Sequence, residues 1–288
     1  MDTKILDGKK IAQELKTEIK SEVLRLKEKG IVPGLAVIIV GEDSASKIYV
    51  KNKKRACEEV GISSEVYELE EKISQEEIIK LITKLNKDET ISGILVQLPL
   101  PKHIDKEKII LAIDLKKDVD CFHPENIGKI FLGLGQEFFL PCTPAGILEI
   151  LKRSEIEIIG KDVVIVGRSN IVGKPLALMM INAGATVTVC NSKTKNLKEK
   201  CLGADILISA VGHAGLITAD MVKQGAAVVD VGMNRNNEGK LVGDVDFSEV
   251  SKIASAITPV PGGVGPMTVV ELLKNTVKSA KDFADKLS

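Results

Sequence analysis

The 288-residue sequence contains no tryptophan, and aromatic residues make up only 3% of it. A hydrophobic core without aromatic bulk has to be built mainly from isoleucine, valine, leucine and alanine. No apolar run approaches the roughly 20 residues that span a bilayer. The first ten residues also lack the apolar segment of a signal peptide. We therefore expect an intracellular, cytoplasmic protein with no membrane partner.

The sequence also lacks an excess of either charge and any pairing of cysteines. Lysine and arginine together number 40, as do aspartate and glutamate, which argues against nucleic acid as the main partner. The five cysteines are far apart and include no C-x-x-C pair. Neither a disulfide framework nor a structural zinc site is expected. The default partner is a small molecule, and no metal is expected.

Apolar patterning divides the chain into two alternating series of strands and helices, and its length favours two domains. In the first half we expect strands at 34–41, 64–70 and 91–99 and helices at 11–30, 46–60 and 75–86. In the second half we expect strands at 162–167, 185–190, 204–212, 226–232 and 254–263 and helices at 175–184 and 265–287. This alternation predicts an α/β fold with largely parallel sheets.

The segment "DVVIVGRSNIVGKP" predicts the first turn of a dinucleotide-binding fold. A β-branched strand runs into Gly167, Ser169 and Gly173, and a helix then opens at Lys174. Glycine lets the backbone approach a pyrophosphate, and the N-terminus of the helix favours an anion. The spacing G-x-S-x-x-x-G nevertheless differs from the G-x-G-x-x-G fingerprint. An ordinary strand-to-helix turn would also require a glycine.

The residues that follow the next strand favour NADP over NAD. An NAD-binding fold usually carries an acidic residue about 20 positions after the turn, where it bonds the ribose 2′-hydroxyl. Here Asn191, Ser192 and Lys193 stand at that point. Arg168 in the turn, with Ser192 and Lys193, can instead hold a 2′-phosphate. We expect NADP as the cofactor, with NAD as the alternative.

Polar residues of the first half gather where the predicted strands end. Ser46, Tyr49 and Lys53 fall at i, i+3 and i+7, on one face of the helix that follows the first buried strand. Gln97 ends the apolar run "GILVQLPLP", and the loop "KKDVDCFHP" adds two aspartates. In open parallel sheets, ligands bind outside the carboxyl ends of the strands. A lysine in such a site can carry acid/base chemistry.

Each of these residues also has a purely structural interpretation. Tyr49 and Lys53 can be an exposed pair, Gln97 can cap a sheet edge, and the aspartates can form turns. The histidines, which lie on separate elements without metal-ligand spacing, and one cysteine are assigned structural roles: His103, His123, His213 and Cys142.

Six segments resemble the methylenetetrahydrofolate dehydrogenase/cyclohydrolase family. They occur in order along nearly the whole chain: "YVKNK" (49–53), "GILVQLPLP" (93–101), "DVDCFHP" (118–124), "PCTP" (141–144), "GRSNIVGKP" (167–175) and "ITPVPGGVGPMT" (257–268). The resemblance implies a homodimeric enzyme that uses NADP to oxidise 5,10-methylenetetrahydrofolate to 5,10-methenyltetrahydrofolate. The same enzyme would hydrolyse that product to 10-formyltetrahydrofolate.

The resemblance also implies roles for individual residues. Lys53 matches the essential lysine of the family, Gln97 the glutamine bonded to it, and Tyr49 the tyrosine that stacks on the folate. Asp120 matches the acid that grips the pterin ring and completes this catalytic set. The implied substrate-binding set is Ser46, Tyr49, Gln97, Leu98, Pro99, Asp120, Pro261, Gly262 and Gly263. The implied cofactor-binding set is Gly167, Arg168, Ser169, Val172, Gly173, Ser192, Val211, Gly212, Gly232 and Thr268.

The domain organisation follows from the same resemblance. An N-terminal folate-binding α/β domain, residues 1–141, is completed by 268–288, a C-terminal helix that packs back on it. Residues 142–267 form a Rossmann-like NADP-binding domain, and the active site is expected in the cleft between the domains.

Two positions depart from the pattern of the family. Cys121 stands where the family usually has glycine, which puts the backbone angles beside Asp120 in question. Asn191 stands where a histidine is common. The alternatives are a dehydrogenase without hydrolase activity, an enzyme that prefers NAD, and a non-catalytic folate- or nucleotide-binding module. The retained Tyr49, Lys53, Gln97 and Asp120 argue against the first alternative. The intact lysine and the complete nucleotide loop argue against the last.

Overall fold

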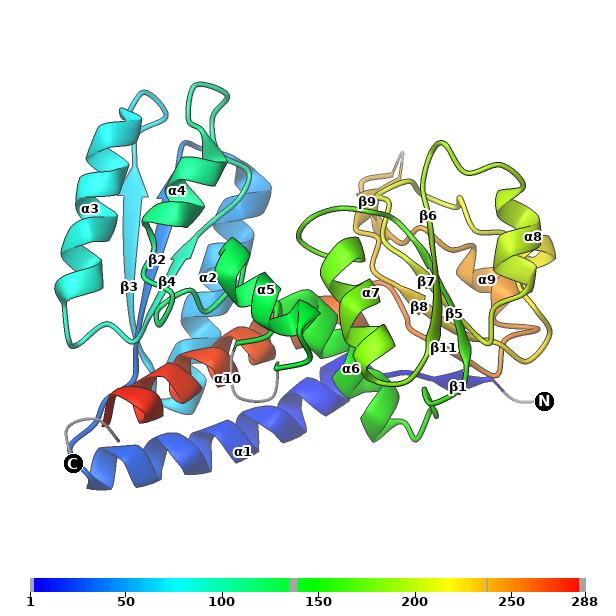
Figure 1. The fold of residues 1–288 in the computed structure, drawn as a ribbon, viewed down its shortest axis with the longest axis horizontal. Helices are drawn as coiled ribbons and strands as arrows, with labels where there is room; N and C mark the ends of the chain where they lie inside the picture. Colours follow the sequence, from blue (N-terminus) through cyan, green and yellow to red (C-terminus); the bar gives the residue numbers. More distant parts are fainter. Residues whose placement is uncertain (1–2, 135–138, 237, 285–288) are drawn as a thin grey trace. The chain divides into compact units, whose positions relative to one another are not determined.

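The computed structural model describes residues 3–134, 139–236 and 238–284, and within them the chain forms two compact α/β units (Figure 1). Unit 1 contains the described residues of Met1–Gln13 and Pro141–Thr268, and unit 2 those of Glu14–Leu140 and Val269–Ser288. Helices α1 (Gly8–Glu28) and α10 (Val264–Ala284) each begin in unit 1 and end in unit 2. Among the described residues, no helix is long and apolar enough to cross a bilayer.

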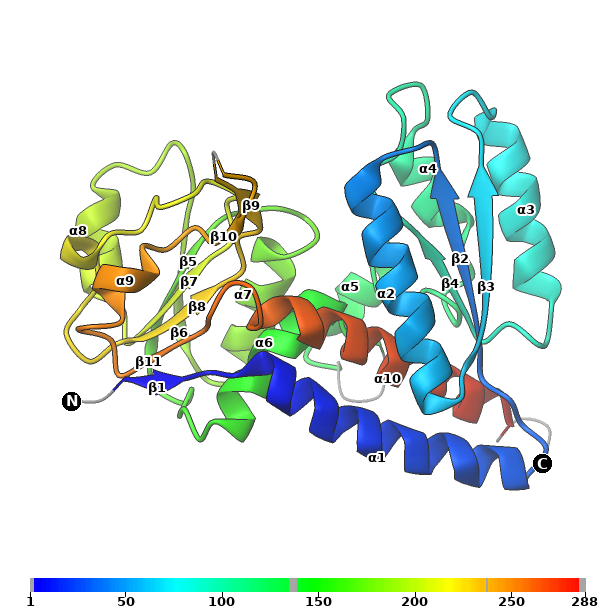
Figure 2. The ribbon, with the colours of Figure 1, turned by 180° about the vertical axis from the view of Figure 1, so that it is seen from behind.

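Unit 2 is built on a three-stranded parallel sheet in the order β3-β2-β4. The strands are β2 (Gly34–Val40), β3 (Ser63–Leu69) and β4 (Gly93–Val96). Every residue of β2 and β4 is buried, as expected for continuous apolar strands of a parallel sheet. The helices are α2 (Ser44–Val60), α3 (Gln75–Lys87), α4 (Lys106–Ala112) and α5 (Pro124–Phe131). Figures 1 and 2 show α3 and α4 on one face of the sheet and α2 on the other.

Unit 1 is built on a six-stranded sheet in the order β1-β11-β8-β7-β5-β6, and all of its pairings are parallel. Its strands are β1 (Lys4–Ile5), β5 (Asp162–Val166), β6 (Thr186–Cys190), β7 (Ile206–Ser209), β8 (Ala227–Asp230) and β11 (Ala256–Ile257). Because β6 lies on one side of β5 and β7 on the other, the winding reverses between β5 and β7. Open α/β sheets bind ligands at the carboxyl ends of the strands at such a reversal.

The remaining elements of unit 1 connect these strands. They are α6 (Cys142–Arg153), α7 (Gly173–Asn182), α8 (Leu197–Leu202), α9 (Phe247–Val250), the 3-10 turn Ala219–Met221 and the antiparallel pair β9 (Asn234–Arg235) and β10 (Leu241–Val242). Val164, Leu207 and Val228, from three neighbouring strands, share one buried cluster. The core is aliphatic, as the absence of tryptophan predicted.

The α/β class, the two-domain organisation and the parallel sheets predicted from the sequence are confirmed. The strand expected at 91–99 ends at Val96, and the prolines that follow it lack an N–H to donate. The short elements β1, α4, α5, α8, α9 and the β9–β10 pair were not predicted, because segments this short show little periodicity. Residues 285–287, which were expected to end the last helix, lie outside the described residues.

Candidate functional site

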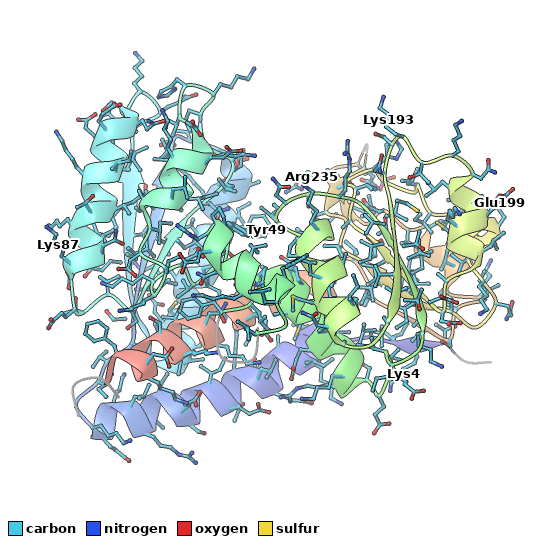
Figure 3. All side chains as sticks on the ribbon, in the orientation of Figure 1. Lys4, Tyr49, Lys87, Lys193, Glu199 and Arg235 are labelled. Carbon is cyan, nitrogen blue, oxygen red and sulfur yellow. The ribbon has the colours of Figure 1, made fainter. Side chains whose placement is uncertain are left out.

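Helix α2 begins just beyond the carboxyl end of β2 and carries three of the predicted site residues. Gly41 turns the chain with a φ of 81°, an angle that glycine adopts readily. Asp43 then caps the helix by accepting hydrogen bonds from Ser46 N at 2.8 Å and Ser46 Oγ at 2.6 Å. Tyr49, labelled in Figure 3, is half-buried, and Lys53 follows one turn later. The cap therefore fixes the face on which all three residues lie.

The Lys53 side chain is buried and hydrogen-bonded to Gln97. Lys53 is only 8% exposed, and its Nζ donates to Gln97 Oε1 at 3.0 Å. Gln97 follows β4, where its backbone N–H donates to Ile38 O at 2.8 Å and its Nε2 donates to Leu98 O at 2.7 Å. These bonds turn the amide oxygen toward the lysine. The interpretation of Lys53 as an exposed surface residue is therefore wrong.

The loop that carries Asp120 is held from inside by Asp118. The Asp118 carboxylate is buried and accepts Phe122 N at 3.1 Å, His123 N at 2.9 Å and Asn126 Nδ2 at 2.8 Å. Burial raises the pKa of Asp118 to about 6, although these hydrogen bonds oppose the shift. Asp118 therefore anchors the loop, while Asp120 is partly exposed.

Cys121 holds a backbone angle that favours glycine. Its φ of 60° lies in the left-handed region, which costs a residue with a Cβ roughly 1 kcal/mol. The side chain is fully buried, and its Sγ donates to Phe139 O at 3.2 Å. Burial raises the pKa of this thiol. The backbone at Cys121 therefore has the left-handed angle that a glycine would also adopt, and the cysteine leaves the turn beside Asp120 unchanged.

A second anchor for this loop comes from α10. Asn275 Nδ2 donates to Val119 O and to Leu140 O, both at 2.8 Å. The methyl groups of Val119 fill the space over Gly93, where a Cβ would lie 2.6 Å from Val119 Cγ1. Asp120 therefore follows a residue whose carbonyl and side chain are both fixed.

Seven of the predicted catalytic and substrate-binding residues belong to unit 2, namely Ser46, Tyr49, Lys53, Gln97, Leu98, Pro99 and Asp120. Leu98 and Asp120 line the same small cavity beside β4. One edge of the sheet and its loops therefore carry three kinds of functional group. They are the buried ammonium group of Lys53 with its amide partner, the phenol of Tyr49 and the carboxylate of Asp120. Such groups can bind a polar ring and move a proton.

Four of the remaining predicted residues lie near the start of α10, in unit 1. Gly262, with its neighbours Pro261 and Gly263, follows β11, and Gly262 O accepts Lys9 N at 2.9 Å. Thr268 Oγ1 lies 3.0 Å from Thr143 Oγ1. Backbone and hydroxyl contacts therefore fix this segment within unit 1.

The turn after β5 is formed by closely packed backbone. Gly167 has a φ of 135°, and a Cβ there would lie 2.4 Å from Ala210 O. A Cβ at Gly173 would lie 2.2 Å from Gly167 O. Ser169 Oγ accepts Val172 N at 3.1 Å and closes the turn. The first turn of α7 contains no acidic residue, so its N-terminus favours an anion such as a pyrophosphate.

Arg168 and Ser192 are exposed in loops that follow two paired strands, β5 and β6. The second loop is closed by Asn191, whose N–H donates to Thr194 Oγ1 at 2.8 Å and whose Oδ1 accepts Lys193 N at 2.9 Å. Figure 3 shows Lys193 extending from this unit. Residues 191–195 include no carboxylate. The cationic side chains of Arg168 and Lys193 and the hydroxyl of Ser192 are groups that can bind a 2′-phosphate.

Val211, Gly212 and Gly232 lie in loops that two buried aspartates hold in place. Val211 N and Gly212 N donate to Asp244 Oδ2 at 2.8 and 3.2 Å, and Gly232 N donates to Asp230 Oδ1 at 2.8 Å. Neither aspartate was predicted as a functional residue. The only sign of them in the sequence is that an acidic residue ends one apolar strand and another lies in "GDVD".

Two of the three histidines make structural side-chain contacts. His103 Nε2 lies 3.0 Å from Ile73 O, and His123 Nδ1 accepts Glu125 N at 3.2 Å as the N-cap of α5. Within 3–134, 139–236 and 238–284, no group of three or more His, Cys, Asp or Glu is placed to hold a metal ion. All five cysteines lie among the described residues, where they are buried and form no disulfide bond.

Two family models match the chain. Residues 6–120 match the model of the tetrahydrofolate dehydrogenase/cyclohydrolase catalytic domain, and residues 141–284 match that of the NAD(P)-binding domain of the same family. Among curated proteins, the chain is 59% identical to a bifunctional protein FolD from Acetivibrio thermocellus, an alignment that covers 98% of each chain.

Solved structures show the same similarity. A FolD methylenetetrahydrofolate dehydrogenase/cyclohydrolase from Campylobacter jejuni is 56% identical with a TM-score of 0.96, over 97% of this chain and 99% of that one. A methylenetetrahydrofolate dehydrogenase-cyclohydrolase from Trypanosoma brucei, complexed with NADP and an inhibitor, is 39% identical with a TM-score of 0.93, over 98% of each chain.

Proposed function

The chain belongs to the tetrahydrofolate dehydrogenase/cyclohydrolase family, and we propose that it is a bifunctional, NADP-dependent enzyme of one-carbon metabolism. It oxidises 5,10-methylenetetrahydrofolate to 5,10-methenyltetrahydrofolate and hydrolyses that product to 10-formyltetrahydrofolate. The observation that carries this proposal is the buried Lys53 Nζ, 3.0 Å from Gln97 Oε1, in a chain that also has a nucleotide-binding turn.

The oxidation step requires mainly positioning from the protein. NADP, when bound, supplies the electron chemistry by accepting a hydride. We propose that the backbone of Gly167, Ser169 and Gly173, with Val172, holds the pyrophosphate at the start of α7. Arg168 and Ser192 hold the 2′-phosphate, and the wider cofactor-binding set includes Val211, Gly212, Gly232 and Thr268. Rigid loops matter because hydride transfer requires the two reacting carbons to be held in contact.

The hydrolysis step requires a group that moves protons. Water adds to the cationic methenyl carbon and loses one proton, which leaves a neutral hydroxyl intermediate. The hydroxyl proton then leaves as one carbon–nitrogen bond breaks. The nitrogen keeps the electron pair of that bond and takes up a proton, so one proton is released overall. We propose that Lys53 Nζ handles a proton at the attacking oxygen, either on the water or on the tetrahedral intermediate. The Gln97 amide keeps that nitrogen in place, and Tyr49 stacks on the folate.

The other proposed substrate contacts follow from the same chemistry. Asp120 accepts hydrogen bonds from the amino and ring N–H groups of the pterin, for which a carboxylate is a strong acceptor. The wider substrate-binding set consists of Ser46, Leu98, Pro99, Pro261, Gly262 and Gly263. We propose that residues 1–141 with 268–288 form the folate-binding domain and that residues 142–267 form the dinucleotide-binding domain. Strand β1 of the first of these domains adds a strand to the six-stranded sheet of unit 1.

We further propose that the protein is a cytoplasmic homodimer that pairs through its dinucleotide domain. Strand β6 ends the six-stranded sheet and has a hydrogen-bonded strand on one side only among the described residues. An open strand edge is a template for pairing with another chain. Val189 on β6 is 39% exposed and Ile181 on α7 is 54% exposed. Sedimentation equilibrium should give twice the chain mass, and Val189→Lys should shift it toward the monomer.

The test of the proposed activity is a spectroscopic assay with methylenetetrahydrofolate and either NADP or NAD. With NADP, NADPH absorbance should rise while methenyl absorbance rises and then decays faster than in an enzyme-free control. Methenyltetrahydrofolate supplied without NADP should also be hydrolysed. NADPH formation without faster decay of the methenyl absorbance would favour the monofunctional dehydrogenase. Equal use of NAD and NADP would contradict the assignment of NADP as the cofactor. Ligand binding without turnover would favour a binding module.

A further inference from the structure

We propose that Asp244 is the positioning residue of the dinucleotide site, because its carboxylate preforms the loop after β7 from inside the protein. The inference rests on the proposed function of unit 1 as the NADP-binding domain. It concerns a residue that binds no ligand itself and acts through the backbone that it holds.

The Asp244 carboxylate is fully buried and accepts five hydrogen bonds. Its donors are Ser209 Oγ at 3.1 Å, Val211 N at 2.8 Å, Gly212 N at 3.2 Å, His213 N at 2.9 Å and Asn234 Nδ2 at 3.0 Å. Three of these donors are consecutive backbone N–H groups that point at one carboxylate. The Val211 side chain, by contrast, is 38% exposed, so the loop bonds inward and presents its outer surface to solvent.

A second carboxylate fixes Asp244 in turn. Asp230 Oδ1 accepts Asp244 N at 2.9 Å, and Asp230 Oδ2 accepts Val245 N at 2.9 Å. No side chain can intrude between these groups, because a Cβ on Gly243 would lie 1.8 Å from Asp230 Oδ2 and one on Gly232 would lie 2.2 Å from Asp244 Oδ1. The loops after β7 and β8 are therefore tied to each other by two buried carboxyl groups.

This arrangement decides which backbone groups a dinucleotide can use. Consecutive N–H groups that converge form an anion-binding concavity, but after β7 that concavity is already filled by Asp244. The N–H groups of Val211, Gly212 and His213 therefore stay bonded to Asp244 and do not bind a phosphate. The loop after β7 is already ordered before a ligand binds. Binding therefore does not have to include the free-energy cost of ordering this loop.

The test compares two isosteric changes two residues apart. Asp244→Asn replaces one acceptor oxygen with an NH₂ group that faces other donors. Asp246→Asn is the matched control, because Asp246 only caps α9 by accepting Ser248 Oγ at 2.8 Å and Glu249 N at 3.4 Å, and asparagine caps helices equally well. Asp244→Asn should raise the Kd for NADPH, measured by fluorescence titration, by about tenfold or more. Asp246→Asn should leave it within about twofold.

Activity measurements separate positioning from loss of fold. Asp244→Asn should raise KM for NADP in parallel with the Kd, with kcat changed about threefold or less. Hydrolysis of methenyltetrahydrofolate without NADP should stay within about twofold of the wild type, since the residues proposed for it in unit 2 are untouched. Wild-type affinity for NADPH in Asp244→Asn, or parallel loss of cofactor binding and hydrolysis, would overturn the proposal.

A milder variant keeps the test decisive if Asp244→Asn does not fold. Asn234 is partly exposed and supplies one of the five donors, so Asn234→Ala should raise the Kd for NADPH about threefold without lowering the thermal midpoint by more than a few degrees. An unchanged Kd in that variant would count against the proposal. If the wild type bound NADPH but turned over no folate, the proposed activity would fail while the role of Asp244 in binding remained measurable.

Discussion

The loop before α5 in unit 2 and the loop after β7 in unit 1 are both built around a buried aspartate that accepts backbone N–H groups. Asp118 holds Phe122 N and His123 N, and Asp244 holds three consecutive N–H groups. The difference lies in what each loop presents. The proposed site of unit 2 consists of side chains, above all Lys53 and Asp120, whereas that of unit 1 consists mainly of the backbone of glycine-rich turns, with the side chains of Arg168 and Ser192.

That difference determines how each site can be tested. The chemistry of unit 2 can be removed one functional group at a time, because each group is a side chain. The backbone groups of unit 1 remain after any substitution, so the part of that site formed by backbone is altered only through residues that shape it. We therefore expect large, single-residue losses of activity in unit 2 and graded losses of affinity in unit 1.

The largest expected effect is that of Lys53→Met. Loss of the ammonium group should lower methenyltetrahydrofolate hydrolysis by about 100- to 10,000-fold, the usual contribution of a group that moves a proton. The hydride step should fall less, because it depends on positioning. Lys54→Met is the matched control, since Lys54 is the next residue and is exposed. Hydrolysis at the wild-type rate in a folded Lys53→Met protein would remove the assigned role.

The second prediction concerns the carboxyl group of Asp118, with a pKa of about 6 in the folded protein and about 3.9 in an unfolded chain. A raised pKa means that the folded state binds the proton more tightly. The group therefore stabilises the fold below about pH 4, and this contribution, of the order of 3 kcal/mol, is lost as the pH rises through 6. The measurement is urea unfolding of the wild type and of Asp118→Asn at several pH values. The free energy of unfolding of the wild type should fall relative to that of the variant as the pH rises from about 4 to 6.

The corresponding carboxyl group in unit 1 is Asp230, whose pKa burial also raises to about 6. Asp230→Asn should show the same sign and pH window in urea unfolding. Other carboxyl groups have lowered pKa values, and their contribution to stability rises with pH. Because these groups are present in both the wild type and the variant, their contributions cancel in the stability difference. A stability difference that does not change with pH would show that these two aspartates are ionised in the folded protein throughout this range.

The third prediction tests the preference for NADP. Arg168→Gln should raise KM for NADP about tenfold, because a charge-assisted bond to the 2′-phosphate is lost. KM for NAD should stay within about twofold, since NAD carries no such phosphate. Lys193→Gln should have a smaller effect of the same kind. Equal changes for both cofactors would mean that Arg168 contacts a part that NAD and NADP share.

The smallest expected effect is that of Asn275→Ala on folate affinity. The variant loses both hydrogen bonds to Val119 O and Leu140 O and loosens the loop that carries Asp120, so KM for folate should rise about threefold to fivefold in both activities. Ser279→Ala is the matched control, because Ser279 also bridges two carbonyls, those of Ser92 and Lys116. It should lower stability while leaving KM for folate unchanged. The Kd for NADPH should change in neither variant.

Much of the fold and part of the site could be predicted from local pattern. Continuous apolar runs indicated β2 and β5 because a strand in a parallel sheet is buried on both faces. Helical periodicity placed Ser46, Tyr49 and Lys53 on one face before any contact was known. The residues that anchor the loops could not be found in this way. Asn275 and Val119 are 156 positions apart, and Ser209 and Asp244 are 35 apart, so no local period connects either pair.

The sequence by itself determined the alternation of strands and helices and the face of α2 on which Tyr49 and Lys53 lie. Continuous apolar runs mark the buried strands, and a period of 3.6 residues marks the face of a helix. The tertiary structure decided that Lys53 is buried rather than solvated, and that its partner is the amide that follows β4. It also decided that the N–H groups after β7 are satisfied by Asp244. Burial and hydrogen-bond partners depend on which distant segments meet, and that is fixed only when the chain has packed.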